Sequence, residues 1–335
     1  MKILLASDAW YPQINGVVRT LNRVREELAP QGHVFEVICP EQFRTFPCPS
    51  YPEIPLAILP GLGMARRIEA VGADAIHIAT EGPIGLAVRN YCVKRGLPFT
   101  TSYHTRFPEY LSARLPVSVE WGYRFMRWFH KPSQAIMVAT QSMKRELEAH
   151  GFHNLVDWTR GVDTTLFRPE APQALDGLDL PRPIHLYVGR VAVEKNIKAF
   201  LELKLEGSKV VVGDGPQRAE LQAQFPEVYF AGAKQGEELA SYYASGDVFV
   251  FPSRTDTFGL VMLEAMASGL PVAAYPVPGP LDIVDGVGVG ALSEDLGFAV
   301  GEAIKVPRAQ CREHALKYSW TACAEMFLEN LHPLR

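Results

Sequence analysis

The sequence lacks the features that mark several large classes of protein. It contains no apolar run near the roughly 18 residues that a membrane-spanning helix needs. The segment Met1–Ala6 is too short for a signal peptide and is followed at once by Ser7 and Asp8, so we expect a buried strand there. The five cysteines are odd in number, scattered and without metal-ligand spacing. These absences favour a globular protein of the reducing cytoplasm, with no metal site.

Two further absences narrow the function. A net charge of −4 gives no reason to expect nucleic acid as a partner. No Gly-x-Gly-x-x-Gly follows the first apolar segment, and residues 286–290, Gly-Val-Gly-Val-Gly, do not match it, which disfavours a dinucleotide-dependent oxidoreductase. The first half of the chain is mildly basic and the second half acidic. This asymmetry is either chance or a sign that the first half meets an anionic surface.

What the sequence does contain is the pattern of two α/β domains. The 335 residues, 47% hydrophobic and 21% charged, suffice for two globular cores. Short apolar runs alternate with helical periodicity in both halves, which predicts two doubly wound domains with parallel sheets. We expect the domains at 1–167 and 168–312, with a proline-rich linker at 168–183 and a C-terminal helix within 313–335.

The expected elements alternate along the chain. In the first half the strands are Lys2–Ala6, Val34–Cys39, Ala75–Ile78, Phe99–Ser102 and Gln134–Val138, and the helices are Gly16–Ala29, Pro83–Arg95 and Ser142–His150. In the second half the strands are Ile184–Val188, Lys209–Val212, Val228–Phe230, Val248–Phe251 and Val272–Ala274, and the helices are Asn196–Leu205, Gln217–Gln224, Gly236–Ala244, Gly259–Ala267 and His314–Leu331. Residues 43–62 hold five prolines and are expected to form an ordered loop.

The most informative segment is residues 251–272. An apolar strand ends at Phe251, a loop rich in Ser, Thr and Asp follows, and a helix begins near Phe258 and ends at Gly269. The first N–H groups of such a helix have no intrahelical partner. A helix N-terminus of this kind binds phosphate or other polar oxygens.

Two carboxylates flank that helix start. The N–H groups of Phe258, Gly259 and Leu260 lie in the first turn, between Asp256 on the loop and Glu264 within the helix. Carboxylates accept hydrogen bonds from hydroxyl groups. The combination suits a sugar that is joined to a nucleoside diphosphate.

Four other segments support a family resemblance. Residues 189–196 read Gly-Arg-Val-Ala-Val-Glu-Lys-Asn after a strand, and residues 211–216 read Val-Val-Gly-Asp-Gly-Pro. Residues 7–17 read Ser-Asp-Ala-Trp-Tyr-Pro-Gln-Ile-Asn-Gly-Val, and residues 103–105 read Tyr-His-Thr. Together with residues 251–272, these segments resemble the retaining glycosyltransferases of family 4, which have the two-domain GT-B fold.

The resemblance implies an architecture and a reaction. The architecture is two doubly wound Rossmann-like domains facing a cleft, an acceptor-binding domain first and a nucleotide-sugar-binding domain second, with the terminal helix crossing back to the first. No Asp-x-Asp occurs, a spacing that commonly holds a divalent metal in the other large glycosyltransferase fold. We therefore expect transfer without a metal or other cofactor. Retention is expected to be front-face, with the leaving phosphate helping to deprotonate the acceptor.

The resemblance also assigns donor-binding residues. Arg190 and Lys195 would neutralise the charge that grows on the diphosphate, although such residues after a strand can also form an ordinary surface pair. Glu264 would bind the ribose hydroxyls. Asp256, where the family usually has Glu, would sit near the 3- or 4-hydroxyl of the hexose. The plainer alternatives are a helix cap for Asp256 and a solvated helix face for Glu264.

Two residues of the first half complete the donor site. His104 follows a strand and matches the family's His near the reacting centre, although a lone His is more often structural. Gly16 lies in the first strand-to-helix loop, where the lack of a side chain lets backbone approach a ligand. The alternative for Gly16 is a plain turn after Asn15.

Residues 117–131 are the candidate acceptor or membrane feature. Trp121, Arg124, Arg127 and Trp128 recur at helical spacing. Basic and aromatic residues on one helix suit a membrane interface, whereas the alternative is a core helix with aromatic packing and solvated arginines. The chain resembles bacterial enzymes that glycosylate diacylglycerol-type lipids, some from GDP-mannose and others from UDP-sugars that carry glucuronosyl or sulfoquinovosyl groups.

The sequence leaves several alternatives open. The resemblance predicts a peripheral enzyme of the inner membrane face with a lipid or glycolipid acceptor, but a soluble sugar acceptor also fits. A GT-B-fold nucleotide-sugar epimerase or hydrolase would make a free sugar or an epimer instead of a glycosylated product. A noncatalytic sugar-binding module is disfavoured by the presence of Arg190, Lys195 and Glu264. The base and sugar of the donor stay open.

Overall fold

The chain folds into two compact units. The computed structural model describes residues 1–335 except 14, 49–50, 113–117, 257 and 335, with the backbone alone at 51–53 and 110–111. Unit 1 is Met1–Arg160 together with Trp320–Arg335, and unit 2 is Gly161–Ser319. The division therefore falls at Gly161, ahead of the proline-rich segment. Residues 158–183, all of them described, contain no helix or strand.

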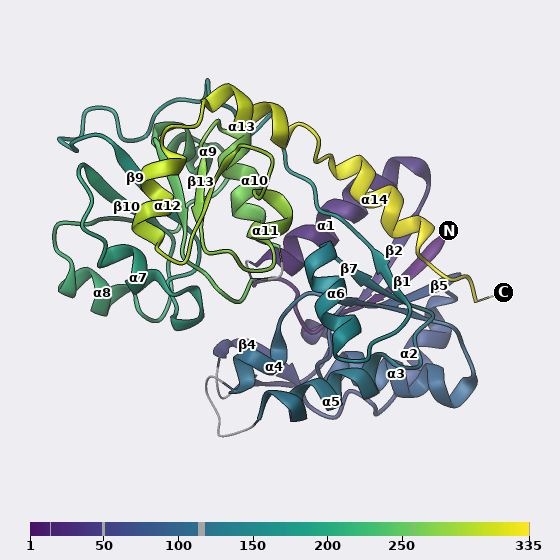
Figure 1. Ribbon diagram of the computed structural model, residues 1–335. Coiled ribbons are helices and arrows are strands. Elements are labelled where there is room, and N and C mark those ends of the chain that lie inside the picture. The colour runs from purple at the N-terminus through teal and green to yellow at the C-terminus, as the bar shows by residue number, and fades with distance from the viewer. Residues whose placement is uncertain (14, 49–50, 113–117, 257, 335) are drawn as a thin grey trace. The chain divides into compact units, whose positions relative to one another are not determined.

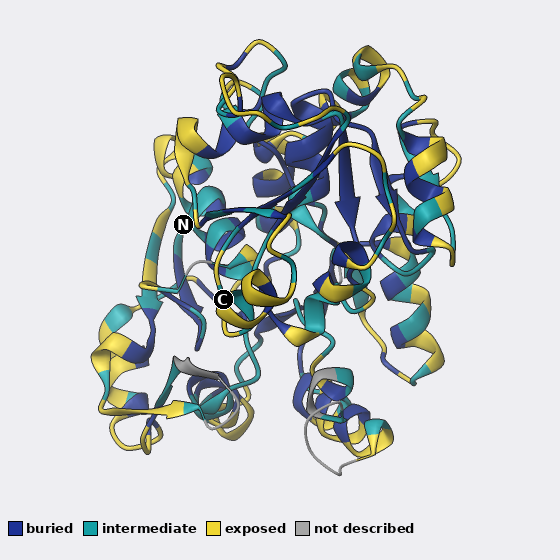
Figure 2. Cartoon of the chain, turned by 90° about the vertical axis from the view of Figure 1, so that its left-hand side faces the viewer, coloured by how far each residue is buried: buried dark blue, intermediate teal, exposed yellow. Residues whose placement is uncertain are grey.

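Unit 1 is built on a parallel sheet with the strand order β2-β1-β5-β6-β7-β8. Its strands are β1 (Lys2–Ala6), β2 (Val34–Ile38), β5 (Ala75–Ile78), β6 (Thr100–Tyr103), β7 (Ala135–Val138) and β8 (Leu155–Asp157). Its helices are α1 (Gly16–Leu28), α2 (Met64–Val71), α3 (Pro83–Arg95), α4 (Phe107–Ser112), α5 (Val119–His130), α6 (Gln141–Ala149) and α14 (Trp320–Glu329), with short 3₁₀ turns η1 (Ala29–Gln31) and η2 (Pro40–Gln42). The central strands are buried on both faces, as parallel strands covered by helices must be (Figures 1 and 2).

Several helices of unit 1 have their first N–H groups bonded to side-chain oxygens from the loops that follow the strands. Asp8, just after β1, accepts hydrogen bonds from the N–H groups of Ile84 (2.8 Å) and Gly85 (3.1 Å) in the first turn of α3. Asn15 caps α1 and Thr140 caps α6 in the same manner. These caps satisfy N–H groups that have no intrahelical acceptor. They also fix the loops at this edge of the sheet.

The proline-rich segment 43–62 was predicted to be a loop, and this prediction is wrong. Strands β3 (Thr45–Cys48) and β4 (Tyr51–Ala57) form a two-stranded antiparallel hairpin there. Pro47 lies opposite Pro55 in its register. In a two-stranded hairpin each strand is an edge strand, so the missing N–H of a proline can face away from the partner.

Unit 2 repeats the architecture with the parallel strand order β11-β10-β9-β12-β13-β14. Its strands are β9 (Ile184–Val188), β10 (Ser208–Val212), β11 (Tyr229–Gly232), β12 (Val248–Phe251), β13 (Val272–Ala274) and β14 (Gly290–Leu292). Its helices are α7 (Ile197–Leu201), α8 (Arg218–Gln224), α9 (Gly236–Ser245), α10 (Leu260–Ala267), α11 (Pro280–Ile283), α12 (Leu296–Ala303) and α13 (Arg308–Ala315), with a 3₁₀ turn η3 (Val193–Lys195).

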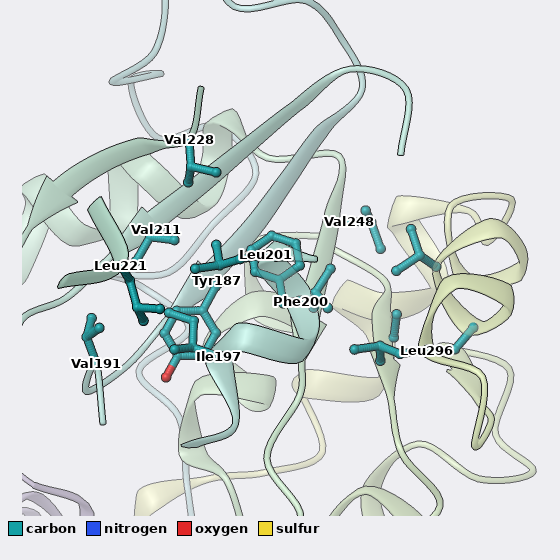
Figure 3. Close-up of a cluster of buried hydrophobic side chains, with 14 of the residues drawn as sticks. Tyr187, Val191, Ile197, Phe200, Leu201, Val211, Leu221, Val228, Val248 and Leu296 are labelled. Atoms are coloured by element: carbon teal, nitrogen blue, oxygen red, sulfur yellow. The ribbon is translucent and has the colours of Figure 1, made fainter. Parts of the chain in front are cut away.

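The core of unit 2 shows why its strands alternate between two sets of helices. On one face Tyr187, Val211 and Val248 pack with residues of α7, α8 and α12 (Figure 3). Successive side chains of a strand point to opposite faces, so Phe249 lies on the other face, where the ring of Tyr243 from α9 packs against it at 6.0 Å between centroids. Helices thus cover both faces of the sheet.

The C-terminal helix predicted at His314–Leu331 is two helices. Helix α13 ends at Ala315 in unit 2, and α14 begins at Trp320 in unit 1. Between them the carbonyl of Tyr318 accepts a hydrogen bond from the N–H of Val162, so it is not used by a continuing helix. Helix α14 lies beside α1, where Thr321 donates to Glu27 (3.0 Å; Figure 1).

Gly213→Ala should lower the stability of unit 2. Gly213 directly follows β10 and has φ +149°, and a Cβ there would lie 1.8 Å from the carbonyl oxygen of Gly189, which directly follows β9. Because both are backbone positions in neighbouring strands, the clash can be relieved only by moving the strand ends. We expect a loss of about 3 kcal/mol, at the upper end of the usual cost of overpacking.

The matched control is Gly301→Ala on α12. A Cβ there has nothing within 4 Å and the φ angle is an ordinary one, so alanine should stabilise the helix by about 0.5–1 kcal/mol. Urea unfolding of both variants, followed through the transition of unit 2, gives the comparison. Equal midpoints for the two variants would show that the strand ends yield without cost.

Candidate functional site

The candidate residues of unit 2 gather at one edge of its sheet. Strands β9 and β12 are hydrogen-bonded neighbours, although they are far apart in sequence. The strand order reverses at this point, which is where ligands bind in open α/β sheets. Arg190 and Lys195 follow the carboxyl end of β9, and Asp256 follows that of β12.

Lys195 and Asp256 form an ion pair across the two loops. Lys195 Nζ lies 2.5 Å from Asp256 Oδ1, with 23% and 18% of the two side chains exposed. The other carboxylate oxygen, Asp256 Oδ2, is buried and has no hydrogen-bond partner among the described residues. Asp256 is not the N-cap residue of α10, a position that Gly259 occupies. The site thus presents an ammonium group next to a carboxylate oxygen that has no hydrogen-bond donor among the described residues.

Polar contacts tie the two loops together. Asn196, in the left-handed conformation at φ 51°, donates from Nδ2 to the carbonyl of Pro252 (3.1 Å). Thr255 donates from Oγ1 to the carbonyl of Glu194 (3.2 Å). Arg190 lies 3.8 Å from Glu194 across one turn. These contacts fix where the cationic side chains stand relative to the start of α10.

Helix α10 begins one to two residues later than predicted. Gly259 has φ +87°, and a Cβ there would lie 2.9 Å from Met262 Cε and 3.0 Å from Phe251 Cζ, so only glycine fits without adjustment. The N–H groups of Phe258, Gly259 and Leu260 lie at the N-terminus of α10, where the helix itself supplies no carbonyl to accept from them. They provide hydrogen-bond donors beside Asp256.

Glu264 does not lie on a solvated helix face. It is 6% exposed, and its Oε2 accepts a hydrogen bond from the hydroxyl of Tyr243 on α9 (2.9 Å). Tyr243 was not singled out from the sequence. A buried carboxylate needs such a partner, and this one holds the Glu264 side chain in a defined orientation.

His104 follows β6 in unit 1 and is half-buried. Its Nε2 lies 2.8 Å from the hydroxyl of Ser102, and its Nδ1 lies 3.3 Å from Nη2 of Arg160. Burial, with the positive charge of Arg160 as the next cause, holds the pKa of His104 well below its ordinary value. Sequence reasoning missed Arg160, whose only signal was an arginine placed three residues after the edge strand β8.

Gly16 is the first residue of α1 and is exposed. The preceding Asn15 accepts from the N–H groups of Val17 and Val18 at 3.0 Å each. Asn15 is therefore the N-cap of α1, and Gly16 is the exposed residue that follows the cap.

Helix α5 carries the residues of the expected membrane or acceptor feature, except Val117, which lies outside the described residues. Trp121 is 65% exposed and Trp128 49% exposed, and the guanidinium of Arg124 lies 5.4 Å from the Trp121 ring centroid. This exposure does not fit the alternative of a core helix with both tryptophans packed inside the unit. Arg127 is held within the unit, by Glu120 (2.9 Å) and the carbonyl of His150 (2.8 Å).

The described residues provide neither a cluster of metal ligands nor a helix that could span a membrane. Within the described ranges, no group of three or more His, Cys, Asp or Glu side chains is arranged to hold a metal ion. In the same part of the chain, the helices are all too short or too polar to span a bilayer.

Two doubly wound units, each with a parallel six-stranded sheet, make up the GT-B fold. The structure of sucrose-phosphate synthase from Thermosynechococcus elongatus superimposes with a TM-score of 0.78 at 21% identity, covering 98% of this chain and 97% of that one. This likeness establishes the fold.

Sequence comparison identifies the family. Residues 14–166 match the family model described as Glycosyltransferase Family 4. Residues 182–304 match the family model described as Glycosyl transferases group 1. A GDP-mannose-dependent alpha-mannosyltransferase of Mycobacterium tuberculosis is 30% identical over 85% of this chain and 81% of its own length. An alpha-monoglucosyldiacylglycerol synthase of Streptococcus pneumoniae is 27% identical over 99% of this chain and 85% of its own length. The chain belongs to glycosyltransferase family 4.

Proposed function

We propose that the protein moves a hexosyl group from a nucleoside-diphosphate sugar, GDP-mannose or a UDP-sugar, to a hydroxyl of a diacylglycerol-type lipid or glycolipid, with retention of configuration. The observation that carries the proposal is the Lys195–Asp256 pair at the switch point of unit 2. The pair supports the proposal because a cation, which suits a diphosphate, lies beside a carboxylate, which suits a sugar hydroxyl.

The chemistry follows from these charges. As the bond between sugar and diphosphate breaks, negative charge grows on the phosphate oxygens. Lys195 and Arg190 would stabilise that charge more in the transition state than in the bound donor, which is the condition for catalysis. The N–H groups at the start of α10 would add uncharged donors. Asp256 holds the ammonium of Lys195 in place.

The relatives support the linkage and the acceptor. Both names describe alpha-linked products, and one names a diacylglycerol. An alpha product from an alpha-linked nucleotide sugar corresponds to retention. The carboxylates of unit 2 play different parts in this scheme, with Asp256 on the hexose and Glu264 on the ribose.

The test has two stages. A thermal-shift screen with GDP, UDP, ADP and their sugars identifies the donor, because a ligand at 100 times its Kd adds about 2.7 kcal/mol to stability. The stabilising donor is then incubated with diacylglycerol in detergent micelles, and products are analysed by mass spectrometry and by NMR of the anomeric centre. A glycosylated lipid with the anomeric configuration of the donor is the expected result. Free sugar, an epimer, or transfer to soluble sugars alone would contradict it.

We further propose that α5 brings unit 1 onto an anionic bilayer. The exposed face of the helix carries Trp121, Phe125 and Trp128, while Tyr123 and Phe129 are buried on the other side. Exposed aromatic rings insert at the level of the lipid headgroups, and a neighbouring cation such as Arg124 adds attraction to anionic lipids.

Replacement of Trp121 and Arg124 by Ser should weaken sedimentation with anionic liposomes. Each basic residue near such a surface contributes roughly 1 kcal/mol, and exposed charges are screened over about 10 Å at 0.1 M salt. Wild type should therefore pellet at low salt and be released at higher salt. Arg145→Ser, an exposed arginine on α6, is the matched control. Equal sedimentation of wild type, control and double variant would remove α5 from the membrane proposal.

A further inference from the structure

Arg160 is buried beside His104 and is held rigidly. It is 4% exposed, and its Nη1 donates to the carbonyls of Trp158 (2.6 Å) and Thr159 (3.0 Å). Its guanidinium stacks over the indole of Trp158, 4.2 Å from the ring centroid. The remaining contact is from Nη2 to His104 Nδ1, at 3.3 Å. The guanidinium therefore has one fixed position from which to act on the imidazole.

The positive charge of Arg160 has no counter-ion nearby. In the part of the chain that the structure describes, no carboxylate lies within ion-pair distance of this guanidinium. Burial lowers the pKa of Arg160 to about 10, so the group still carries its charge at physiological pH. Burying a charge without an opposite partner is costly, and the side chain that accepts from Nη2 is that of His104.

Hydrogen-bond chemistry then fixes the tautomer of His104. A guanidinium can only donate, so the facing nitrogen, Nδ1, must be the unprotonated one. The proton of the neutral ring is then on Nε2, which donates to the hydroxyl of Ser102 at 2.8 Å. An imidazolium would turn an N–H toward the N–H of Arg160 and bring two positive charges together. The site therefore selects the neutral ring.

The other titratable groups around the pair are uncharged. His77 of β5 lies on the far side of Ser102 (3.2 Å), and burial lowers its pKa to about 3. Cys323 of α14 faces Arg160, and burial raises its pKa to about 11. Neither group adds charge near neutral pH, which leaves Arg160 as the charge that acts on His104.

We propose that Arg160 is a positioning residue, which holds His104 as a neutral imidazole protonated on Nε2, so that His104 acts as a fixed neutral ring and neither gains nor loses a proton during transfer. This rests on the proposed function in one respect, the role near the reacting centre that the family resemblance gives to His104. It agrees with the front-face scheme that the resemblance implies, in which the leaving phosphate takes the proton of the acceptor.

The tautomer is measured directly by NMR without any substrate. Protein labelled with ¹⁵N-histidine gives side-chain proton–nitrogen correlations that distinguish the two neutral tautomers and the imidazolium, and a His104→Gln variant assigns the signal. We expect wild-type His104 to show the Nε2–H tautomer with no titration between about pH 5 and pH 9. A wild-type His104 that titrates near the ordinary histidine pKa, or carries its proton on Nδ1, would overturn the proposal.

Variants test the cause. Arg160→Met removes the donor and the charge, so the pKa of His104 should rise toward its ordinary value. Below that pKa the variant's kcat should fall about tenfold per pH unit relative to wild type. Arg160→Lys keeps a donor and a positive charge and should restore both the tautomer and the wild-type pH profile. An Arg160→Met protein with wild-type tautomer and profile would show that Arg160 is structural only.

The matched control is Arg308→Met in unit 2. Arg308 is also a largely buried arginine that donates to backbone carbonyls, those of Gly246 (2.7 Å) and Ser268 (3.2 Å). Its loss should lower stability but leave the His104 spectrum and the pH profile unchanged. A protein that fails to transfer sugar but shows the expected spectrum would sink the proposed function alone. A protein that transfers sugar but shows His104 in the other tautomer, or as an imidazolium, would contradict the role of Arg160 alone.

Discussion

Lys195→Ala is expected to lower kcat for sugar transfer by on the order of 100-fold or more, the usual cost of removing one group that stabilises charge in a transition state. The ammonium sits at the switch point of unit 2, 2.5 Å from Asp256. Because the side chain is partly exposed and its ion pair joins two loops, the fold should survive. Rates are measured with saturating donor, and stability by thermal unfolding.

The control for this prediction lies three residues along the chain. Lys198→Ala removes another lysine of the same segment, one that is well exposed and pairs with Glu202 on α7 (3.6 Å). Exposed pairs of this kind contribute little, so the control should keep wild-type turnover. Turnover of Lys195→Ala close to that of Lys198→Ala would remove the diphosphate assignment. A parallel Arg190→Ala variant shows whether the two cations share the task.

Much of the fold could be predicted because it depends on local patterns. The buried strands β1, β5, β9, β12 and β13 were predicted to the residue, since continuous apolar runs bounded by turn residues are distinctive. The edge strands β8 and β14 were missed because they are short and only partly buried. The hairpin at 43–62 was missed because proline was interpreted as excluding strands, whereas a two-stranded hairpin tolerates it.

The sequence pointed to candidate site residues but not to the contacts between them. The spacing of residues 251–272 pointed to Asp256 and Glu264, and residues 189–196 pointed to Arg190 and Lys195. No local pattern could show that Lys195 reaches Asp256, because the contact joins loops after two strands that meet only in the sheet.

Partners from other elements were also out of reach. Tyr243 meets Glu264 across the pairing of α9 and α10. Arg160 follows β8 and His104 follows β6, and β7 lies between these two strands in the sheet, yet the two side chains are in contact. Such contacts depend on tertiary packing, which sequence spacing does not encode.

Asp256→Asn and Glu264→Gln are expected to separate transfer from nucleotide binding. Asp256 Oδ2 is buried and has no partner among the described residues, which leaves it available for a sugar hydroxyl. Its replacement by Asn removes the charge that holds Lys195, so we expect transfer to fall by about 100-fold. Affinity for the nucleoside diphosphate alone should stay within a few-fold of wild type, because the released ammonium can still bind phosphate. Asp256→Glu keeps the carboxylate and should transfer far better than Asp256→Asn.

Glu264→Gln should act on the nucleotide instead. The hydroxyl of Tyr243 can still donate to the amide oxygen, so the buried contact at 2.9 Å survives. The ribose hydroxyls lose a charged acceptor, and hydrogen bonds to charged groups contribute about 1.5–3 kcal/mol. Nucleoside diphosphate affinity, measured by titration calorimetry, should therefore fall about tenfold or more. Glu302→Gln, an exposed glutamate on α12 that pairs with Lys305, is the control and should bind as wild type does. Equal losses of nucleotide affinity in Asp256→Asn and Glu264→Gln would mean that both carboxylates serve one part of the donor, and the separation of hexose from ribose contacts would be wrong.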